Sequence, residues 1–180
     1  MNNLLLAPHN DDEALFASYI ILRWKPKVLI ITDSHIHEAK FGESRGIVAR
    51  RKESEEAMKI LGVEVDFLGI PDNGLYLDNL IVNLEDYGNP DGKIFAPAKQ
   101  GGHKDHDTVS EAATKIFGGR VVYYSTYAKD DLTPKGQVAL FPTPDEEKLK
   151  KQALVCYKTQ TSLNPHHFNA VRGKPEYLNL

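Results

Sequence analysis

The stretch Leu4-Leu5-Leu6-Ala7-Pro8-His9-Asn10-Asp11-Asp12-Glu13 leads from an apolar run directly into a cluster of polar side chains. The run from Leu4 to Ala7 predicts a strand, and the pattern from Asp12 to Trp24 predicts a helix that Pro26 stops. A second apolar run, from Val28 to Thr32, predicts the next strand. Strands that alternate with helices predict a mostly parallel sheet with helices on both faces.

The alternation continues toward the end of the chain. Further helices are predicted at 46–61, 108–117 and 144–157, and further strands at 65–68, 93–97 and 120–124. Thr143, Pro144 and Glu146 are typical of a capping box with proline at the first helical position. The segment from Asp72 to Gly92 is interpreted as a candidate active-site loop. We expect one α/β domain over residues 1–180, a Rossmann-like three-layer sandwich.

Composition limits the class of protein. The chain has 180 residues, the length of about one domain, and its 41% hydrophobic and 26% charged residues are ordinary for a soluble globular protein. A formal net charge of -3 gives no basic footprint for nucleic acid. The one cysteine, Cys156, excludes an internal disulfide framework and a multi-cysteine zinc cluster.

The sequence predicts no membrane segment. Its longest aliphatic runs, such as Val28 to Ile31, are far shorter than the ~20 residues that span a bilayer. Leu4 to Leu6 has no Lys or Arg before it and no longer apolar core, unlike a signal peptide. We therefore expect a cytoplasmic protein without membrane or nucleic-acid partners, and the sequence leaves its oligomeric state open.

Two polar motifs follow predicted strands. His9-Asn10-Asp11-Asp12 comes after the first strand, and Gly102-His103-Lys104-Asp105-His106 comes after the fourth. In an open α/β sheet, ligands bind beyond the carboxyl ends of the strands, where the strand order reverses. A strand order of 3-2-1-4-5 makes the first and fourth strands neighbours there. We therefore expect both motifs to face one crevice.

The chemistry of the two motifs is complementary. His9, Asp12 and His106 can supply two imidazoles and one carboxylate, the three-ligand pattern of catalytic zinc sites. Asp11 would then be an unliganded carboxylate beside the metal, placed to take a proton from water. Asp105 could hold the His103 imidazole in one tautomer and favour its charged form.

Each motif alone has a simpler explanation. Acidic residues at 11–13 suit a helix start without any metal. Asp105 or Asp107 could likewise cap the helix at 108–117. The presence of both motifs at corresponding strand ends favours a metal site over these alternatives.

A third motif makes the pattern specific. Arg50-x-x-Glu53-x-x-x-Ala57-x-x-x-Leu61-Gly62 is followed by Phe-Leu-Gly-Ile-Pro-Asp at 67–72. With the Pro-His-x-Asp-Asp-Glu start and the late His-x-Asp-His, this series resembles the LmbE-like, or PIG-L, family of zinc-dependent de-N-acetylases. The resemblance covers about residues 4–109 and is loose beyond Phe117. Asn10 stands where the family often has proline.

The resemblance implies the LmbE-like fold and a role for each site residue. It matches the zinc ligands to His9, Asp12 and His106, the general base to Asp11, the histidine that stabilises the oxyanion or protonates the leaving amine to His103, and the orienting partner of that histidine to Asp105. Asp72 and Arg50 match positions near the substrate sugar. For Arg50, a helix-surface ion pair with Glu53 is the alternative.

The resemblance therefore implies a hydrolase that removes the acetyl group from an N-acetylated amino sugar or N-acetylglucosamine conjugate, releasing acetate and a free amine. One zinc ion per chain is expected, although a His/carboxylate set also accepts iron or cobalt. Two alternatives stay open: a sugar-binding member of the fold with little turnover, and another metal-dependent hydrolase, acting on an amide or a phosphoester. A second carboxylate-rich metal site would favour a phosphoesterase, and we find none in the sequence.

The remaining histidines carry less weight. His35 and His37 are similar to the His-x-His of metallo-β-lactamase folds, but Ala39-Lys40 replaces the Asp-His that would follow. His166 and His167 are expected in a surface turn.

Overall fold

The computed structural model describes residues 2–35, 39, 40, 42, 46–72, 74–88, 90–163 and 165–180. Its strands are β1 (Leu4–Ala7), β2 (Lys27–Thr32), β3 (Val65–Ile70), β4 (Ile94–Pro97), β5 (Val121–Tyr124), β6 (Val138–Leu140) and β7 (Glu176–Asn179). Its helices are α1 (Asp12–Phe16), α2 (Ser18–Trp24), α4 (Ile47–Leu61), α5 (Leu77–Tyr87), α6 (Lys104–Phe117), the 3-10 turn η2 (Gly118–Arg120), α7 (Pro144–Leu154), α8 (Lys158–Thr161) and α9 (Pro165–Val171).

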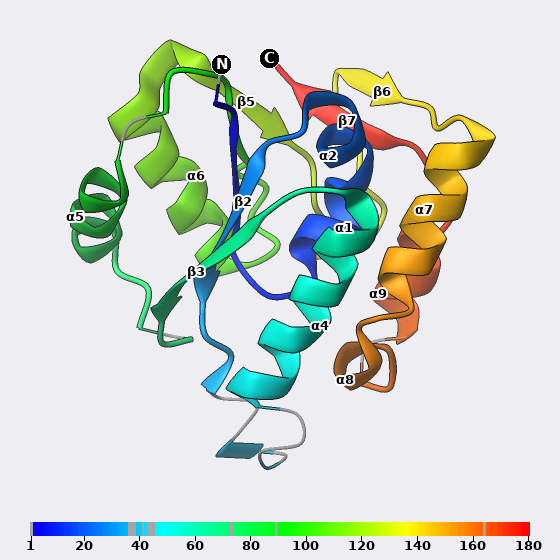
Figure 1. Ribbon diagram of the computed structural model, residues 1–180. Helices are drawn as coiled ribbons and strands as arrows, with labels where there is room; N and C mark the ends of the chain where they lie inside the picture. Colours follow the sequence, from blue (N-terminus) through cyan, green and yellow to red (C-terminus); the bar gives the residue numbers. More distant parts are fainter. Residues whose placement is uncertain are drawn as a thin grey trace.

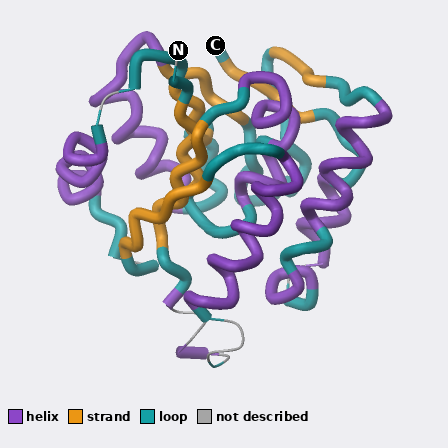
Figure 2. Tube along the Cα trace, in the orientation of Figure 1, coloured by secondary structure: helices purple, strands orange, loops and turns teal. Residues whose placement is uncertain are grey.

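The strands form one sheet in the order β3-β2-β1-β4-β5-β7-β6. Strands β1 to β5 are parallel, which confirms the predicted mostly parallel sheet and its 3-2-1-4-5 order. Strands β7 and β6 extend the β5 edge in antiparallel pairing, and no pattern in the sequence predicted them. Figures 1 and 2 show helices on both sides of this sheet.

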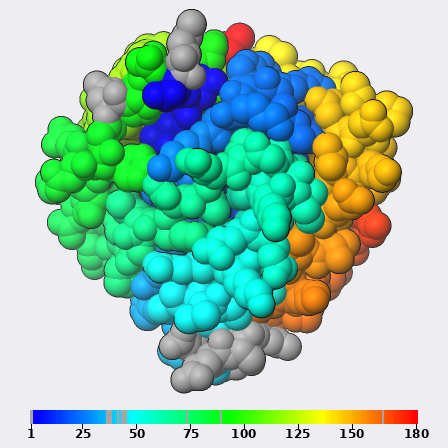
Figure 3. All heavy atoms as spheres, in the orientation of Figure 1, coloured from blue at the N-terminus to red at the C-terminus, as the bar shows by residue number. Residues whose placement is uncertain are grey.

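Two apolar cores lie on opposite faces of the sheet. Because side chains alternate along a strand, Leu5 and Ala7 of β1 enter one core, and Leu4 and Leu6 enter the other. The first core is closed by residues of α1, α2, α4, α7 and α9, and the second by residues of α5 and α6. In Figure 3, atoms of α2 (blue) and α4 (cyan) lie next to each other on the visible face of the molecule. The expected three-layer α/β architecture is therefore confirmed.

The predicted helix from Asp12 to Trp24 is broken in the structure. Ala17, with φ -134°, separates α1 from α2. The break frees backbone groups, and two buried side chains satisfy them: Glu176 accepts a hydrogen bond from the Tyr19 N–H at 2.8 Å, and Lys150 donates one to the Leu15 carbonyl at 2.8 Å. Both come from the far end of the chain, where no local pattern near Ala17 points to them.

Two other elements differ from the prediction. Most of the segment interpreted as an active-site loop is helix α5, and its Leu77, Leu80, Ile81 and Leu84 follow helical spacing. Helix α6 begins at Lys104 instead of Thr108, so His103 of the second polar motif is its N-cap, and Asp105 and His106 lie in its first turn. Among the described residues, no helix is long and apolar enough to cross a membrane.

Candidate metal centre

The two polar motifs meet at the carboxyl edge of the sheet. His9 follows β1 and His103 caps α6 after β4, and β1 pairs with β4. The His9 Nε2 atom lies 3.0 Å from Asp105 Oδ2, and the His106 Nε2 atom lies 3.0 Å from Asp12 Oδ2. Residues almost a hundred positions apart thus form one cluster, as the strand order led us to expect.

Asp12 lies between two imidazoles. Its Oδ2 atom is 3.1 Å from His9 Nδ1 and 3.0 Å from His106 Nε2. The other ring nitrogen of His106 contacts the Thr126 hydroxyl at 3.1 Å, which orients the ring. His106 Nε2 is buried and makes no hydrogen bond to the described residues despite its nearness to Asp12. Two imidazole nitrogens within 3.1 Å of one carboxylate oxygen suit a shared cation.

Buried charge at the cluster also suits a cation. Burial opposes the charged form of His9, yet hydrogen bonds with Asp105 and Asp12 raise its pKa to about 10. Burial likewise opposes the charge on Asp12, but the neighbouring His106 and His9 hold the pKa of that carboxyl well below its usual range. The carboxylates therefore stabilise positive charge between them. His9, Asp12 and His106 fit a divalent metal in donor type and charge.

His103 is a second candidate for the third ligand. The ligand atoms of His9, His103 and His106 all lie within 4.8 Å of one another. However, the His103 side chain is 41% exposed, whereas that of Asp12 is 4% exposed. The backbone N–H of Asp105 donates to His103 Nδ1 at 3.2 Å, which leaves Nε2 as its free ring nitrogen.

Asp105 lies near two histidines. Its carboxylate contacts His9 at 3.0 Å and lies 3.8 Å from His103 Nδ1. Burial, together with the nearby His9 and His106, lowers the pKa of His103. The hydrogen bond from the Asp105 N–H to Nδ1 places the proton of a neutral His103 on Nε2.

Asp11 has a strained backbone next to these residues. Its φ of 136° is a conformation that L-residues rarely adopt. Burial raises the pKa of Asp11 to about 8, although the neighbouring Arg50, whose Nη2 atom lies 3.7 Å from Asp11 Oδ2, acts in the opposite direction. A carboxyl with this surrounding is suited to accept a proton near neutral pH.

Arg50 faces the centre from α4. It is buried and donates to the Asn10 carbonyl. The alternative of a surface pair with Glu53 does not hold, because the Glu53 carboxylate accepts hydrogen bonds from Thr159. Asn10, at the position where proline was noted for the family, is fully buried and joins the hydroxyls of Ser54 and Ser34.

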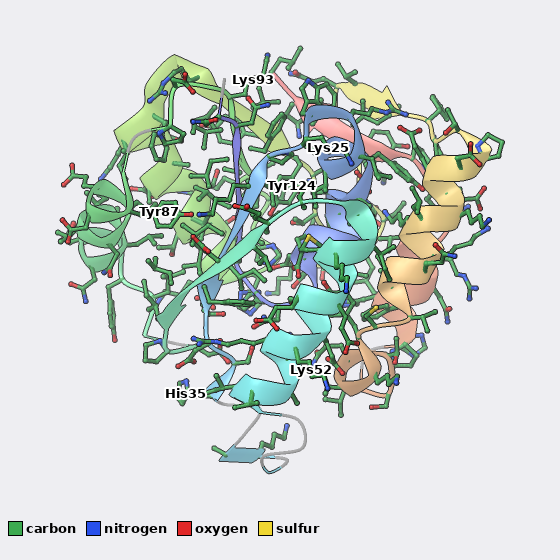
Figure 4. The ribbon with its side chains drawn as sticks, in the orientation of Figure 1. Lys25, His35, Lys52, Tyr87, Lys93 and Tyr124 are labelled. Atoms are coloured by element: carbon green, nitrogen blue, oxygen red, sulfur yellow. The ribbon has the colours of Figure 1, made fainter. Side chains whose placement is uncertain are left out.

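Asp72 belongs to a second cluster beside the first. The ligand atoms of Asp33, His35 and Asp72 lie within 4.8 Å of one another, and the Ser34 N–H donates to Asp72 at 3.2 Å. Figure 4 shows His35 at the end of β2. This group was not predicted from the sequence, because His35 was considered only with His37 and Asp72 only as a position near the substrate sugar. His37 lies outside the described residues.

Four further residues near the centre were not recognised as such from the sequence. Glu13 accepts from the Asp11 N–H at 2.9 Å and from the Tyr157 hydroxyl at 2.6 Å. The Tyr127 ring lies 5.4 Å from the His106 ring and 5.1 Å from that of His167, which belongs to α9 and not to a surface turn. The position of Glu13 beside Asp11-Asp12 is a local signal; the other three have none.

Comparison with models of known families identifies the family of this chain. The model of the PIG-L family, GlcNAc-PI de-N-acetylase, matches residues 4–117. The chain belongs to the PIG-L family. The match includes every residue that we assigned to the site, from His9 to His106. A search among curated proteins gave no match.

Solved structures share the fold of this PIG-L family member at low identity. The 4-carboxy-2-hydroxymuconate hydratase GalB from Pseudomonas putida KT2440 is 17% identical with a TM-score of 0.74, and the alignment covers 99% of this chain and 95% of GalB. A deacetylase of the teicoplanin biosynthesis pathway is 16% identical with a TM-score of 0.72 over 98% of this chain and 96% of that one. The zinc-inhibited form of teicoplanin deacetylase Orf2 is 16% identical with a TM-score of 0.71 over the same shares.

Proposed function

We propose that this PIG-L family member is a metal-dependent deacetylase that releases acetate from an N-acetylated amino sugar or N-acetylglucosamine conjugate. The observation that carries the proposal is the meeting of His9, Asp12 and His106 around one carboxylate oxygen, with the partly buried Asp11 beside them. Its placement in the family supports the same reaction. GalB is a hydratase, so the fold alone does not decide the chemistry.

The metal would be held by His9 Nδ1, Asp12 Oδ2 and His106 Nε2. When bound, a divalent ion lowers the pKa of water and polarises the acetamide carbonyl. Zinc is our first choice for these donors. Iron and cobalt suit them as well, and one form of teicoplanin deacetylase Orf2 is inhibited by zinc. We therefore base the assay on a panel of metals.

Asp11 and His103 then have different roles in the reaction. Asp11 takes one proton from the attacking water while the water oxygen bonds to the acetyl carbon. His103 donates its Nε2–H to the oxygen on which negative charge develops. Asp11 returns the proton to the amide nitrogen as the C–N bond breaks, which yields acetate and the free amine. Arg50 and Asp72, from α4 and the end of β3, are proposed to bind sugar hydroxyls.

The test is acetate release from a panel of N-acetylglucosamine conjugates by protein loaded separately with zinc, iron or cobalt. We expect turnover with at least one metal and its loss in Asp11→Asn. Substrate binding without acetate release under all three metals would favour the sugar-binding alternative and overturn the proposed reaction.

The cluster of Asp33, His35 and Asp72 is the one observation that favours a rival phosphoesterase, because two neighbouring metals are typical of phosphoester hydrolysis. Our proposal predicts one metal per chain and no hydrolysis of p-nitrophenyl phosphate or its diester. Two bound metals together with phosphoester turnover would support the rival.

A further inference from the structure

Asp11 is held in its strained conformation from both sides. Its carbonyl accepts the N–H groups of Ala14 and Leu15 at 3.0 and 2.9 Å, the first bonds of α1. Its own N–H donates to Glu13 Oε2 at 2.9 Å. A backbone φ of 136° persists only where surrounding contacts impose it. The Glu13 carboxylate supplies the contact on the N–H side.

Glu13 is in turn held by a residue far along the chain. Its other oxygen, Oε1, accepts the Tyr157 hydroxyl at 2.6 Å, and both side chains are fully buried. Neither Lys nor Arg forms an ion pair with Glu13 among the described residues. A buried carboxylate without a cation is costly. The hydrogen bonds from the Asp11 N–H and the Tyr157 hydroxyl offset part of this cost.

Tyr157 is itself fixed by the C-terminal helices. It lies between α7 and α8, and its ring packs against Phe168 of α9 with centroids 6.4 Å apart. This part of the chain follows residue 117, where the family match ends. The C-terminal helices thus reach the backbone of Asp11 through two hydrogen bonds.

We propose that Glu13 and Tyr157 are positioning residues that hold Asp11 in the geometry needed to accept the proton of water, an inference that rests on the proposed deacetylase reaction. The link runs from the Tyr157 hydroxyl to Glu13 and from Glu13 to the Asp11 N–H. Loss of either side chain function leaves the metal ligands in place and lets the Asp11 peptide relax. A shift of about 1 Å at a reacting group can cost up to ~10²-fold in rate.

The first test is Tyr157→Phe, which removes only the hydroxyl. We expect kcat to fall by about 10-fold to 10²-fold, with unchanged metal content and KM. The matched control is Tyr124→Phe. Tyr124, labelled in Figure 4, is equally buried, and its hydroxyl donates to the Leu6 carbonyl at 2.8 Å instead of to Glu13. The control loses a similar hydrogen bond and should keep its kcat.

A second pair of variants separates positioning from general damage. Glu13→Gln should lower kcat to a similar extent as Tyr157→Phe, and the double variant should lose no more than either single one, because both act through one link. In an Asp11→Asn background, Tyr157→Phe should have no further effect. An equal fall in kcat in both backgrounds, or an unchanged kcat in Tyr157→Phe alone, would overturn the inference.

A measurement independent of turnover completes the test. The Asp11 amide proton, bonded to a buried carboxylate, should exchange slowly with solvent, and Tyr157→Phe should speed its exchange while Tyr124→Phe does not. Unchanged exchange in Tyr157→Phe would refute the link to the Asp11 backbone. If the wild-type protein deacetylates nothing on the panel, the proposed function fails, and the exchange experiment still decides whether this pair positions Asp11.

Discussion

Asp11 and Asp12 are neighbours in the sequence, but their carboxylates lie in different surroundings. Asp12 contacts two imidazoles, whereas Asp11 lies near Arg50 and has a pKa raised by burial. We expect Asp11→Asn to keep its metal and to lose about 10²–10⁴-fold in kcat, the usual scale for general acid–base catalysis. Asp12→Asn should instead bind metal more weakly. Metal analysis and kinetics on both variants check the assignment, which is reversed if Asp11→Asn is the one that loses metal.

Replacing His103 tests whether it or Asp12 is the third metal ligand. If Asp12 is the third ligand, His103→Ala keeps the metal and loses on the order of 10²–10³-fold in kcat, the scale for one oxyanion donor. If His103 is a ligand, as its distance from His9 and His106 allows, the same variant loses metal. Elemental analysis of His103→Ala beside His35→Ala, a histidine of the second cluster, distinguishes these outcomes.

At the scale of elements, the start of α7 contains a charge pair whose contribution to stability depends on pH. Arg23 of α2 binds Glu146 at 2.7 Å, and hydrogen bonds from Arg23 lower the pKa of Glu146 from 4.5 to about 2. Because the folded protein lowers this pKa, the pair stabilises the fold above pH 4.5, and the stabilisation fades as pH falls toward 2. Both side chains are partly exposed to solvent, so we expect only about 1 kcal/mol.

Arg23→Gln tests this pair without removing the capping box of Thr143 and Glu146. Urea unfolding should show the variant less stable than wild type by about 1 kcal/mol at neutral pH. The difference should shrink steadily as pH is lowered below 4.5. A difference that stays constant down to the acid limit would mean that packing of the arginine, and not its charge, matters.

The break between α1 and α2 depends on a buried ion pair. Lys150 binds Glu176 at 2.7 Å with both side chains 2% exposed. Lys150→Met would leave the Glu176 carboxylate buried without its partner, and we expect a loss of about 3–5 kcal/mol in the free energy of unfolding. Lys151→Met is the control, because the Lys151 side chain is 42% exposed and pairs with Glu147 on the surface. Equal effects in denaturant unfolding would contradict the role of the pair.

Elements with strong local signals were predictable from the sequence. The five parallel strands, the capping box at Thr143 and the Gly62 stop of α4 all lie where the patterns indicate. The break at Ala17 and the antiparallel strands β7 and β6 were not predictable, because both depend on contacts with distant residues. The apolar residues of α5 have helical spacing in the sequence, but we interpreted the segment from Asp72 to Gly92 as a loop.

The same difference between local sequence signals and contacts with distant residues applies to the site. Strand order alone brought the motifs of β1 and α6 together, so the cluster of His9, Asp12 and His106 was predictable as a group. Which imidazole lies nearer to the Asp105 carboxylate was not predictable from the sequence, because His9 and His103 both lie close to it. Tyr157, just before α8, and His167, on α9, reach the site from segments with no motif of their own.

At the scale of the whole molecule, the proposed metal would act as a crosslink. His9 and Asp12 come from the β1–α1 junction, and His106 comes from α6, on the other face of the sheet. A ligand that binds only the folded state stabilises it by RT ln(1 + [L]/Kd), about 4 kcal/mol at a thousandfold excess over Kd. For a chain of 180 residues this corresponds to a rise in Tm of roughly 8–16 °C.

We therefore expect removal of metal with a chelator to lower the Tm by that amount and its return to restore it. His106→Ala should abolish the response, because one of the three donors is lost. His35→Ala should keep the full response, since the second cluster is not part of the crosslink. Calorimetry on the three proteins with and without metal checks this. A response that disappears in His35→Ala and survives in His106→Ala would place the stabilising metal at Asp33 and Asp72, beyond the ends of β2 and β3, and would move the catalytic assignment with it.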